Sequence, residues 1–577
     1  MKILPDFKYG IICLLALAAC SKAKTDSPTA KITPGGGDTT VTISPQKDPV
    51  TAPTAGFFLD DWAAKTFTTP AYADTTKPSA TATVTINVDY SNVVTKVSKY
   101  LFGNNTNPYM GQIVTEPVLI NDIKSLSPNI LRFPGGNISS VYFWNGQIPA
   151  DAPANLYDTN GNSVAASYWL GNNTASWTLS LDNYYSALQQ TNSTGIITVN
   201  YSYARYGTSA HPDQVAAHLA ANWVRYDKGR TKYWEIGNES GGPWQAGYQI
   251  DVTQNKDGQP KIITGALYGT HFKVFADSMR AAAKEVGAQI EIGAQIVNPI
   301  SYNSADLAWN SGLFASAGNY PDFYIVHDYY TGQDNENAAT ILATPATESQ
   351  AIMTWVNSSE QQGGVQSKPI ALTEWNLFAS GSDQMVSNIA GIHATMVLGE
   401  LLKNKFGMAS RWDLANGWNG GDDQGMFSMG DEPDNATKWN PRPAFYHMYF
   451  FQKYFGDRMV NSTVTGSTDV FSYASSFSSG QAGVVVVNRG LASQVVNINI
   501  QNFAAGTRFY YYVLVGGTDN GNFSRKVYIN GNGPSSVSGG PLNYAQIKAK
   551  AALIQGGIKI ASPPQSVIFV VADSKIN

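Results

Sequence analysis

Short runs of hydrophobic and β-branched residues alternate with longer amphipathic segments between residues 99 and 456. This alternation predicts parallel strands joined by crossover helices. Eight of the runs have the length of strands: 101–104, 129–133, 195–201, 233–237, 290–295, 323–327, 370–374 and 408–413. Three of the segments between them carry apolar residues at helical spacing: 213–226, 271–286 and 385–403. Eight strands separated by helices predict an α/β chain with a closed (β/α)8 TIM barrel.

The pattern changes after the barrel. Residues 457–577 contain strands and turns without helical periodicity, with clear strand patterns at 482–488, 495–500, 509–515 and 566–571. This predicts a C-terminal antiparallel β-sandwich. Residues 82–98 begin with a strict alternation of apolar and polar positions, so we expect an N-terminal strand here that joins the sandwich from the other end of the chain.

The segment 20–81 is dominated by Thr, Pro, Ala, Lys, Asp and Gly. Such a composition buries too little apolar area to order itself, so we expect a flexible tether. One short apolar patch at 57–62 could dock on the folded body.

The first nineteen residues have the features of an export signal. Met1, Lys2 and Lys8 provide a basic start, and the apolar run 11–19 ends in small residues before Cys20. Residues 17–20 resemble a bacterial lipobox, in which the cysteine is acylated after cleavage. We therefore expect an exported protein, lipid-anchored at Cys20 to a bacterial membrane. An ordinary signal peptide with an incidental cysteine is the alternative.

Composition narrows the possible partners. Cys13 and Cys20 are the only cysteines, so the mature fold is expected to lack disulfides. A net charge of -4 with 14% charged residues argues against a nucleic-acid partner. A surface rich in neutral polar and aromatic groups suits a carbohydrate. The sequence shows no metal-ligand cluster, phosphate-binding loop or nucleotide fingerprint, so no cofactor or metal is expected.

Two glutamates follow apolar strands. Glu239 ends the stretch 233–239, which reads Tyr-Trp-Glu-Ile-Gly-Asn-Glu, and Glu374 ends the strand 370–374 and is followed by Trp-Asn. The carboxyl ends of barrel strands form the catalytic face of such folds. Two carboxyl groups from different strands are therefore expected to meet there.

A carboxyl pair is what glycosidic cleavage requires. One carboxyl protonates the leaving oxygen and the other meets the oxocarbenium-like carbon, and a separation of about 5 Å makes the enzyme retaining. We assign Glu239 as general acid/base and Glu374 as nucleophile. Burial and the neighbouring negative charge should raise the pKa of Glu239, which predicts a bell-shaped pH profile.

These motifs resemble the retaining glycosidases of clan A and, within that clan, the α-L-arabinofuranosidases of glycoside hydrolase family 51. Residues 131–137 (Leu-Arg-Phe-Pro-Gly-Gly-Asn) are similar to the second-strand motif of the family. Residues 233–239, 322–330 and 373–376 are similar to its acid/base, sixth-strand and nucleophile motifs. The resemblance implies a TIM barrel, hydrolysis of plant or algal polysaccharides by double displacement, and no cofactor.

The same resemblance assigns roles to residues around the pair. It places Asn238 on the sugar 2-hydroxyl and His327 in the sugar site, and it lets Tyr329 donate to the nucleophile. Asn137 is either a further sugar ligand or a turn residue. Five tryptophans fall at or just beyond predicted strand ends: Trp144, Trp244, Trp375, Trp412 and Trp418. We select Trp375 and Trp412 among them as platforms for a sugar face.

One departure leaves the sugar open. Family 51 usually has a Glu-His pair shortly after the first-strand Phe-Gly, whereas Phe102-Gly103 is followed here by residues 104–111 without an acid. The insertion 148–178 and the loop 416–425 would also reshape the cleft. The alternative is an endo- or exo-acting member of the same clan on xylan, galactan, agar-like or uronic-acid polymers.

Two readings from other classes also stay open. The chain could be a surface glycan-binding lipoprotein without catalysis, or a structural cell-envelope protein. Neither class requires two carboxylates at opposed strand ends. The sugar, the linkage and the oligomeric state are not determined by the sequence.

Overall fold

The computed structural model describes residues 44–127, 130–298, 308–332, 337–518 and 523–575. The predicted signal peptide and Cys20 lie outside these residues. From Gln46 onward the chain forms one compact unit. Among the described residues, no helix has the length and apolar character needed to cross a membrane.

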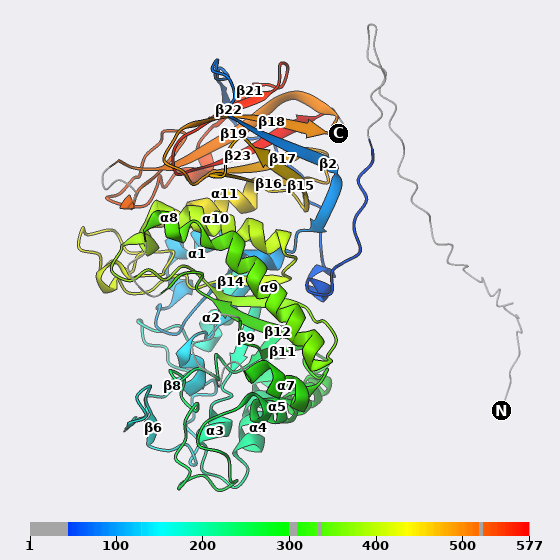
Figure 1. Ribbon diagram of the computed structural model, residues 1–577. Helices are drawn as coiled ribbons and strands as arrows, with labels where there is room; N and C mark the ends of the chain where they lie inside the picture. The colour runs from blue at the N-terminus through cyan, green and yellow to red at the C-terminus, as the bar shows by residue number, and fades with distance from the viewer. Residues whose placement is uncertain (1–43, 128–129, 299–307, 333–336, 519–522, 576–577) are drawn as a thin grey trace, which may run out of the picture. The chain divides into compact units, whose positions relative to one another are not determined.

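Eight parallel strands in the described part of the chain close into a barrel (Figure 1). In barrel order from the first strand they are β3 (Gly103–Asn105), β4 (Ile130–Phe133), β9 (Thr194–Val199), β10 (Tyr233–Ile236), β11 (Glu291–Gln295), β12 (Phe323–Asp328), β13 (Ile370–Trp375) and β14 (Met408–Arg411). Each strand overlaps one of the predicted runs. The predicted (β/α)8 barrel is confirmed.

Helices follow the strands and cover the barrel. They are α1 (Pro117–Ser125), α2 (Leu181–Thr191), α3 (Tyr203–Tyr206), α4 (Pro212–Asp227), α5 (Gly265–Val286), α7 (Trp309–Ala317), α8 (Ala338–Ile341), α9 (Thr344–Gly363), α10 (Asn388–Lys403) and α11 (Pro443–Tyr454). Thr264 caps α5 by accepting from the backbone N–H of Leu267, and Gly287 ends it in a left-handed conformation. Two small strand pairs lie in the long connection after β4: β5 (Tyr142–Phe143) with β8 (Trp169–Leu170), and β6 (Asn155–Tyr157) with β7 (Ser163–Ala165).

The remaining strands form a mostly antiparallel sheet of eleven strands within the described residues. They are β1 (Tyr72–Asp74), β2 (Val84–Lys96), β15 (Arg458–Thr465), β16 (Val470–Ser476), β17 (Ala482–Asn488), β18 (Gln494–Gln501), β19 (Ala505–Gly516), β20 (Val527–Ile529), β21 (Ala549–Leu553), β22 (Ile558–Ser562) and β23 (Ser566–Ser574). Ile86 of β2 and Ile498 of the neighbouring strand β18 share one buried cluster with Ile568 of β23, which β15, β16 and β17 separate from β2 in the sheet. The sheet therefore packs on itself as a sandwich, as predicted.

The strand β2 lies between β15 and β18, antiparallel to the first and parallel to the second. The sandwich packs on the helices α10 and α11. Tyr473 of β16 donates to Glu400 Oε1 of α10 at 3.1 Å, and the ring of Phe569 contacts Phe450 of α11. The two helices thus connect the sandwich to the barrel (Figure 1).

The second half of the predicted tether is ordered, which corrects the prediction for residues 46–81. The short 3-10 helix η1 (Gly56–Leu59) buries Phe58 against Tyr100, Tyr233 and Phe323. These residues stand at the amino-terminal ends of the barrel strands. The apolar patch that we expected to dock therefore closes the bottom of the barrel, and β1 pairs with β21 further along.

Candidate active site

Glu239 is held by a strained turn at the carboxyl end of β10. Its φ of 43° lies in the left-handed region, a conformation that costs a non-glycine residue about 1–3 kcal/mol. The side-chain amide of Gln295 on β11 secures both sides of the turn. It donates to Ile236 O at 2.9 Å and accepts from the backbone N–H of Ser240 at 2.7 Å. The neighbouring strand β11 thus stabilises the strained backbone of Glu239 through Gln295.

The carboxylate of Glu239 accepts from three side chains. His327 Nδ1 lies 3.0 Å from Oε1, while the indole N–H of Trp244 donates to Oε2 at 2.6 Å. Gln245 Nε2 lies 3.4 Å from Oε2 and donates to Asn137 Oδ1 at 2.8 Å. Gln245 therefore links Asn137 to the carboxylate of Glu239, so Asn137 lies at the edge of the site.

Glu374 is fixed from two sides at the end of β13. Arg132 Nη1 donates to Oε1 at 2.8 Å, and the Tyr329 hydroxyl donates to Oε2 at 2.9 Å. The fully buried Arg132 also donates to Glu235 Oε2 at 2.6 Å and to Asn238 Oδ1 at 2.8 Å. One guanidinium thus joins side chains from β4, β10 and β13 and aims the carboxylate of Glu374.

His327 stands between the two glutamates. Its Nδ1 is 3.0 Å from Glu239 Oε1 and 3.7 Å from Glu374 Oε2, and its Nε2 is 3.1 Å from Thr373 Oγ1. One atom from each of the three groups lies within 4.8 Å of the others. The structure therefore brings Glu239, Glu374, His327 and Tyr329 into a single constellation, as their strand positions predict.

The pKa of Glu239 differs from the direction expected from the sequence. Burial opposes its ionisation, but the hydrogen bond and charge of His327, with smaller contributions from Trp244 and Arg132, outweigh burial and lower the pKa of Glu239. Burial also opposes the charge on His327, yet Glu374 and Glu239 together raise its pKa. Without substrate, the shared proton therefore resides on His327, because an imidazole between two carboxylates competes successfully for it.

The same three groups have the donor set of a metal site. Two carboxylates and an imidazole within 4.8 Å could ligate a divalent cation. However, Arg132 already forms an ion pair with Glu374 at 2.8 Å, which reduces the negative charge that could hold a cation.

The chain is similar in sequence to known α-L-arabinofuranosidases. Residues 122–340 match the family model described as the alpha-L-arabinofuranosidase 1 domain. An intracellular exo-alpha-(1->5)-L-arabinofuranosidase of Acetivibrio thermocellus is 25% identical over 228 residues, covering 38% of this chain and 40% of that enzyme. The matched region thus spans less than half of the relative's length.

The resemblance to α-L-arabinofuranosidases is therefore confirmed. Two solved arabinofuranosidases share the fold over 85% of this chain: that of Thermotoga maritima (18% identity, 99% of its chain, TM-score 0.58) and that of Xanthomonas axonopodis pv. citri (14%, 100%, 0.57). A family 44 xyloglucanase of Paenibacillus polymyxa, with 13% identity and a TM-score of 0.53, also covers 85% of this chain and 99% of its own. The fold is thus common to glycosidases of several specificities.

The two tryptophans selected from the sequence lie in different environments. Trp412 follows β14 and is partly exposed, and a Cβ added at Gly136 would lie 2.6 Å from its ring. The glycine pair after β4 thus makes room for this indole. Trp375 is a correction: it is 0% exposed and packs in the barrel core. Successive side chains of a strand point to opposite sides, so the residue after the inward Glu374 points away from the cleft.

The loop after β3 lacks the expected acid, but a carboxyl group from β14 lies next to it. Asn107 Nδ2 donates to Asp413 Oδ2 at 2.6 Å, and the Tyr109 hydroxyl donates to the same oxygen at 3.4 Å. Burial, together with the charge of Asp423, raises the pKa of Asp413 well above its usual range. The loop that lacks an acid therefore contacts a fully buried carboxyl group from the segment that follows β14.

Two important residues were not singled out from the sequence. Arg132 interrupts the apolar run of β4, and a charge inside such a strand is itself a signal, because arginine is buried almost only when paired. Trp244 was considered among the strand-end tryptophans but not selected. Its position five residues after Glu239, directly behind the turn-forming Gly-Gly-Pro of residues 241–243, is the sequence signal that points to it.

Proposed function

We propose that this chain is a retaining glycoside hydrolase that removes α-L-arabinofuranosyl residues, with Glu239 as acid/base and Glu374 as nucleophile. The observation that carries the proposal is the pairing of two strand-end carboxylates within 4.8 Å, one bonded to an imidazole and the other to a guanidinium and a phenol. So short a separation leaves room for a covalent intermediate and too little for the water of an inverting reaction.

In the first step, a Glu374 carboxylate oxygen attacks the anomeric carbon while the glycosidic C–O bond breaks. The leaving oxygen takes the proton of Glu239. Arg132 and Tyr329 hold the carboxylate of Glu374 in position during the attack through their hydrogen bonds to its two oxygens. Asn238 Nδ2 is buried and has no partner within the described residues, so it is free to donate to the sugar 2-hydroxyl.

The proton that Glu239 donates begins on His327. The 3.0 Å contact between His327 Nδ1 and Glu239 Oε1 provides the route. As Glu374 loses its negative charge in forming the ester, its hold on the imidazolium weakens, and the developing negative charge on the leaving oxygen draws the proton through Glu239.

In the second step, water replaces the leaving group. Glu239 now accepts a proton from that water, the oxygen bonds to the anomeric carbon, and the ester bond to Glu374 breaks. Glu239 then passes this proton to His327 across their 3.0 Å contact, which restores both carboxylates and the protonated imidazole without any proton from solvent. The anomeric configuration is retained because two inversions occur.

The choice of arabinofuranose rests on the motif resemblance and on the family model over residues 122–340. The Acetivibrio relative, named for exo-α-(1→5) cleavage, makes arabinan the first substrate to test. A bifunctional glucanase-xylanase from a metagenome library shares the fold at a TM-score of 0.54, which keeps an endo- or exo-glycanase on another polymer as the second candidate.

The test is a panel of aryl glycosides and polysaccharides supplied to the protein from residue 46 onward. Hydrolysis of the aryl α-L-arabinofuranoside would support the proposal. Activity confined to a xylan, galactan or other glycan would change the proposed substrate but not the proposed catalytic pair. Binding of glycans without any hydrolysis would favour the non-catalytic surface lipoprotein. The absence of both binding and hydrolysis would favour a structural role.

We also propose export and lipid anchoring at Cys20, on the basis of the lipobox-like residues 17–20. Metabolic labelling with a fatty-acid analogue should mark the wild-type protein and not Cys20→Ser. A labelled Cys20→Ser protein would contradict the anchor at this residue.

A further inference from the structure

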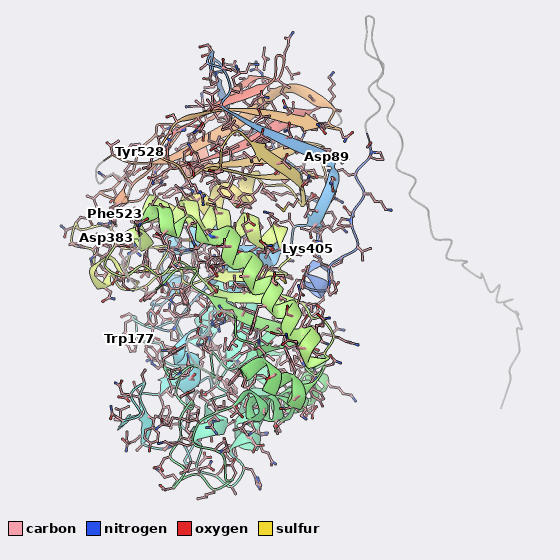
Figure 2. All side chains as sticks on the ribbon, in the orientation of Figure 1. Asp89, Trp177, Asp383, Lys405, Phe523 and Tyr528 are labelled. Carbon is pink, nitrogen blue, oxygen red and sulfur yellow. The ribbon has the colours of Figure 1, made fainter. Side chains whose placement is uncertain are left out.

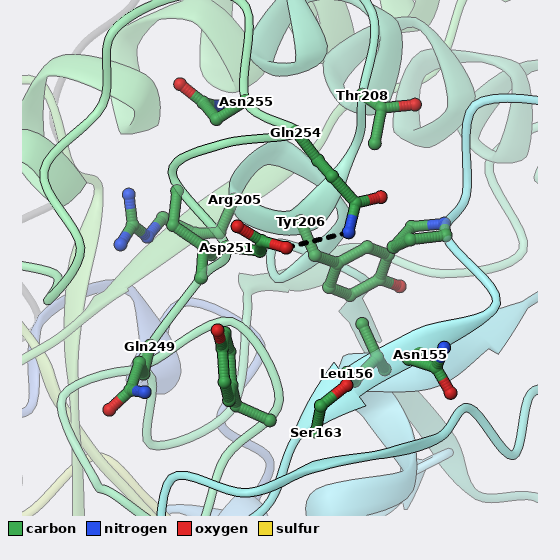
Figure 3. A pocket seen from close by; sticks show the side chains of 13 residues that line it. Asn155, Leu156, Ser163, Arg205, Tyr206, Thr208, Gln249, Asp251, Gln254 and Asn255 are labelled. Carbon is green, nitrogen blue, oxygen red and sulfur yellow. Dashed lines mark hydrogen bonds between the residues drawn. The ribbon is translucent and has the colours of Figure 1, made fainter.

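A second pocket opens at the rim of the barrel, away from the two glutamates. Its walls come from the β6–β7 hairpin, the segment after β9 and the loop 249–255 after β10, all of which follow carboxyl ends of barrel strands. It therefore opens on the catalytic side. The lining residues are Pro153, Asn155, Leu156, Tyr157, Ser163, Arg205, Tyr206, Thr208, Gln249, Ile250, Asp251, Gln254 and Asn255 (Figure 3). The space, counted out to its open mouth, is about 420 Å³.

The charged groups of the lining are already engaged. Arg205 donates from Nε to Gly247 O at 3.0 Å, from Nη1 to Gln259 Oε1 at 2.5 Å and from Nη2 to Pro260 O at 2.9 Å. Asp251 accepts from its own loop, including the side chain of Gln254 drawn in Figure 3. The pocket thus offers neither a free cation for a uronic acid nor a free carboxylate for a cation.

Several of the neutral polar groups in the lining, in contrast, have no partner among the described residues. The side chains of Asn155, Ser163 and Gln249 make no hydrogen bond in the described part of the chain, and Asn255 Nδ2 is buried without a partner there. Amides and hydroxyls both donate and accept, as a sugar hydroxyl does. Aliphatic and aromatic surface beside them can cover the C–H face of a sugar ring, from Leu156, Tyr157 and Ile250.

The pocket is connected to the acid/base group through its own walls. Arg205 holds the backbone of Gly247, three residues beyond the Trp244 that donates to Glu239. Tyr206 donates to Ser140 O at 3.2 Å, and the Ser140 hydroxyl donates to Gln245 Oε1 at 2.8 Å. One loop thus lines both the pocket and the acid/base group.

We infer that this pocket is an accessory subsite for a neutral sugar unit of a polymer, bound away from the bond that is cleaved. The inference rests on the proposed function for the ligand class. It adds that the enzyme prefers a chain long enough to reach both sites over a small glycoside. The first-step chemistry at Glu374 does not depend on it.

Two variants test the pocket by different means. Ser163→Trp places a large ring in the opening from an exposed strand position, and Asn155→Ala with Gln249→Ala removes two unpaired amides without touching the buried lining. Asn160→Trp is the matched control, because Asn160 is exposed at the tip of the same hairpin and does not line the pocket. Each protein is compared with wild type for its melting temperature.

The first readout is kcat/KM on linear α-1,5-arabinan and on 4-nitrophenyl α-L-arabinofuranoside. We expect both pocket variants to lose about tenfold on arabinan, as two or three lost hydrogen bonds would give, and to keep wild-type rates on the aryl glycoside. Asn160→Trp should match wild type on both. Equal losses on the two substrates, or no loss on arabinan, would overturn the subsite.

The second readout needs no catalysis. Native gels containing linear arabinan, arabinoxylan or galactan should retard wild type more than Ser163→Trp. Equal retardation of the two proteins in every gel, or none at all, would overturn the subsite. If wild type is retarded through this pocket but hydrolyses nothing, the proposed function fails while the subsite stands, so the two outcomes are distinguishable.

Discussion

The two ends of the barrel are built from the same eight strands and have opposite chemistry. At the amino-terminal end, Phe58 packs against Tyr100, Tyr233 and Phe323 in an apolar cluster. At the carboxyl end, Arg132 bridges Glu235 and Glu374 while His327 bridges Glu374 and Glu239. One end excludes water with aromatic rings, and the other holds charges close together.

Along a barrel strand, the residues that stabilise the fold thus lie at one end and the residues of the candidate site at the other. Tyr233 belongs to the apolar cluster, and Glu235 and Glu239, a few residues later on the same strand and turn, belong to the charged site. Strained backbone is sustained at the charged end, where Glu239 has a positive φ. Substitutions at the two ends should therefore be distinguishable by whether they change activity, stability or both.

The largest effect is expected at the charged end. Glu374→Gln keeps the shape of the side chain but removes the proposed nucleophile, so kcat should fall by about 10³-fold or more with little change in melting temperature. Glu285→Gln, at an exposed ion pair with Arg225, is the control and should retain full activity. Comparable rates for Glu374→Gln and wild type on the best panel substrate would rule out this catalytic pair.

Arg132→Met should lower both the catalytic activity and the stability, although Arg132 lies at the charged end of the barrel. It leaves Glu235 and Glu374 buried without their cation, which should cost about 3–5 kcal/mol in the free energy of unfolding and also misplace the nucleophile. Urea unfolding with parallel kinetics measures both. Full stability in the variant would mean that Arg132 serves alignment only.

Phe58→Ala should affect stability alone. Removing this ring from the apolar cluster should lower the free energy of unfolding by about 3–5 kcal/mol and leave kcat of the folded protein unchanged. Exposed Val50→Ala in the same segment is the control and should unfold like wild type. A lower kcat at temperatures where Phe58→Ala is folded would show that the two ends are coupled.

His327→Gln should move the alkaline limb of the pH profile. In wild type the raised pKa of His327 keeps the shared proton bound to higher pH, and activity should fall as pH rises through that pKa. The variant must hold the proton on Glu239 alone, so the limb should shift to lower pH. An unchanged limb measured across about pH 4–9 would contradict a proton held by His327.

The barrel strands could be predicted because buried parallel strands have continuous apolar runs, and the glutamates because they end two of them. Side-chain direction was harder to predict. Trp375 was assigned to the cleft since it adjoins Glu374, although adjacent strand residues point to opposite sides. The docked segment 46–62 has the composition of a linker, and its order depends on aromatic contacts with residues far away in sequence.

The pKa of Glu239 could not be predicted for a related reason. Its direction depends on a 3.0 Å contact with His327, which is 88 residues away in the chain. Burial alone predicts a raised value, and only the position of the imidazole reverses it.

The most direct test of Glu374 as the nucleophile of a retaining enzyme is mass spectrometry of Glu239→Gln, quenched during turnover of an aryl α-L-arabinofuranoside. An activated phenol needs little acid assistance to leave, whereas hydrolysis of the ester needs the missing base, so a glycosyl-enzyme should accumulate. We expect one pentosyl adduct on the peptide that contains Glu374. Unlabelled protein that releases sugar of inverted configuration, or a label on another residue, would contradict this mechanism.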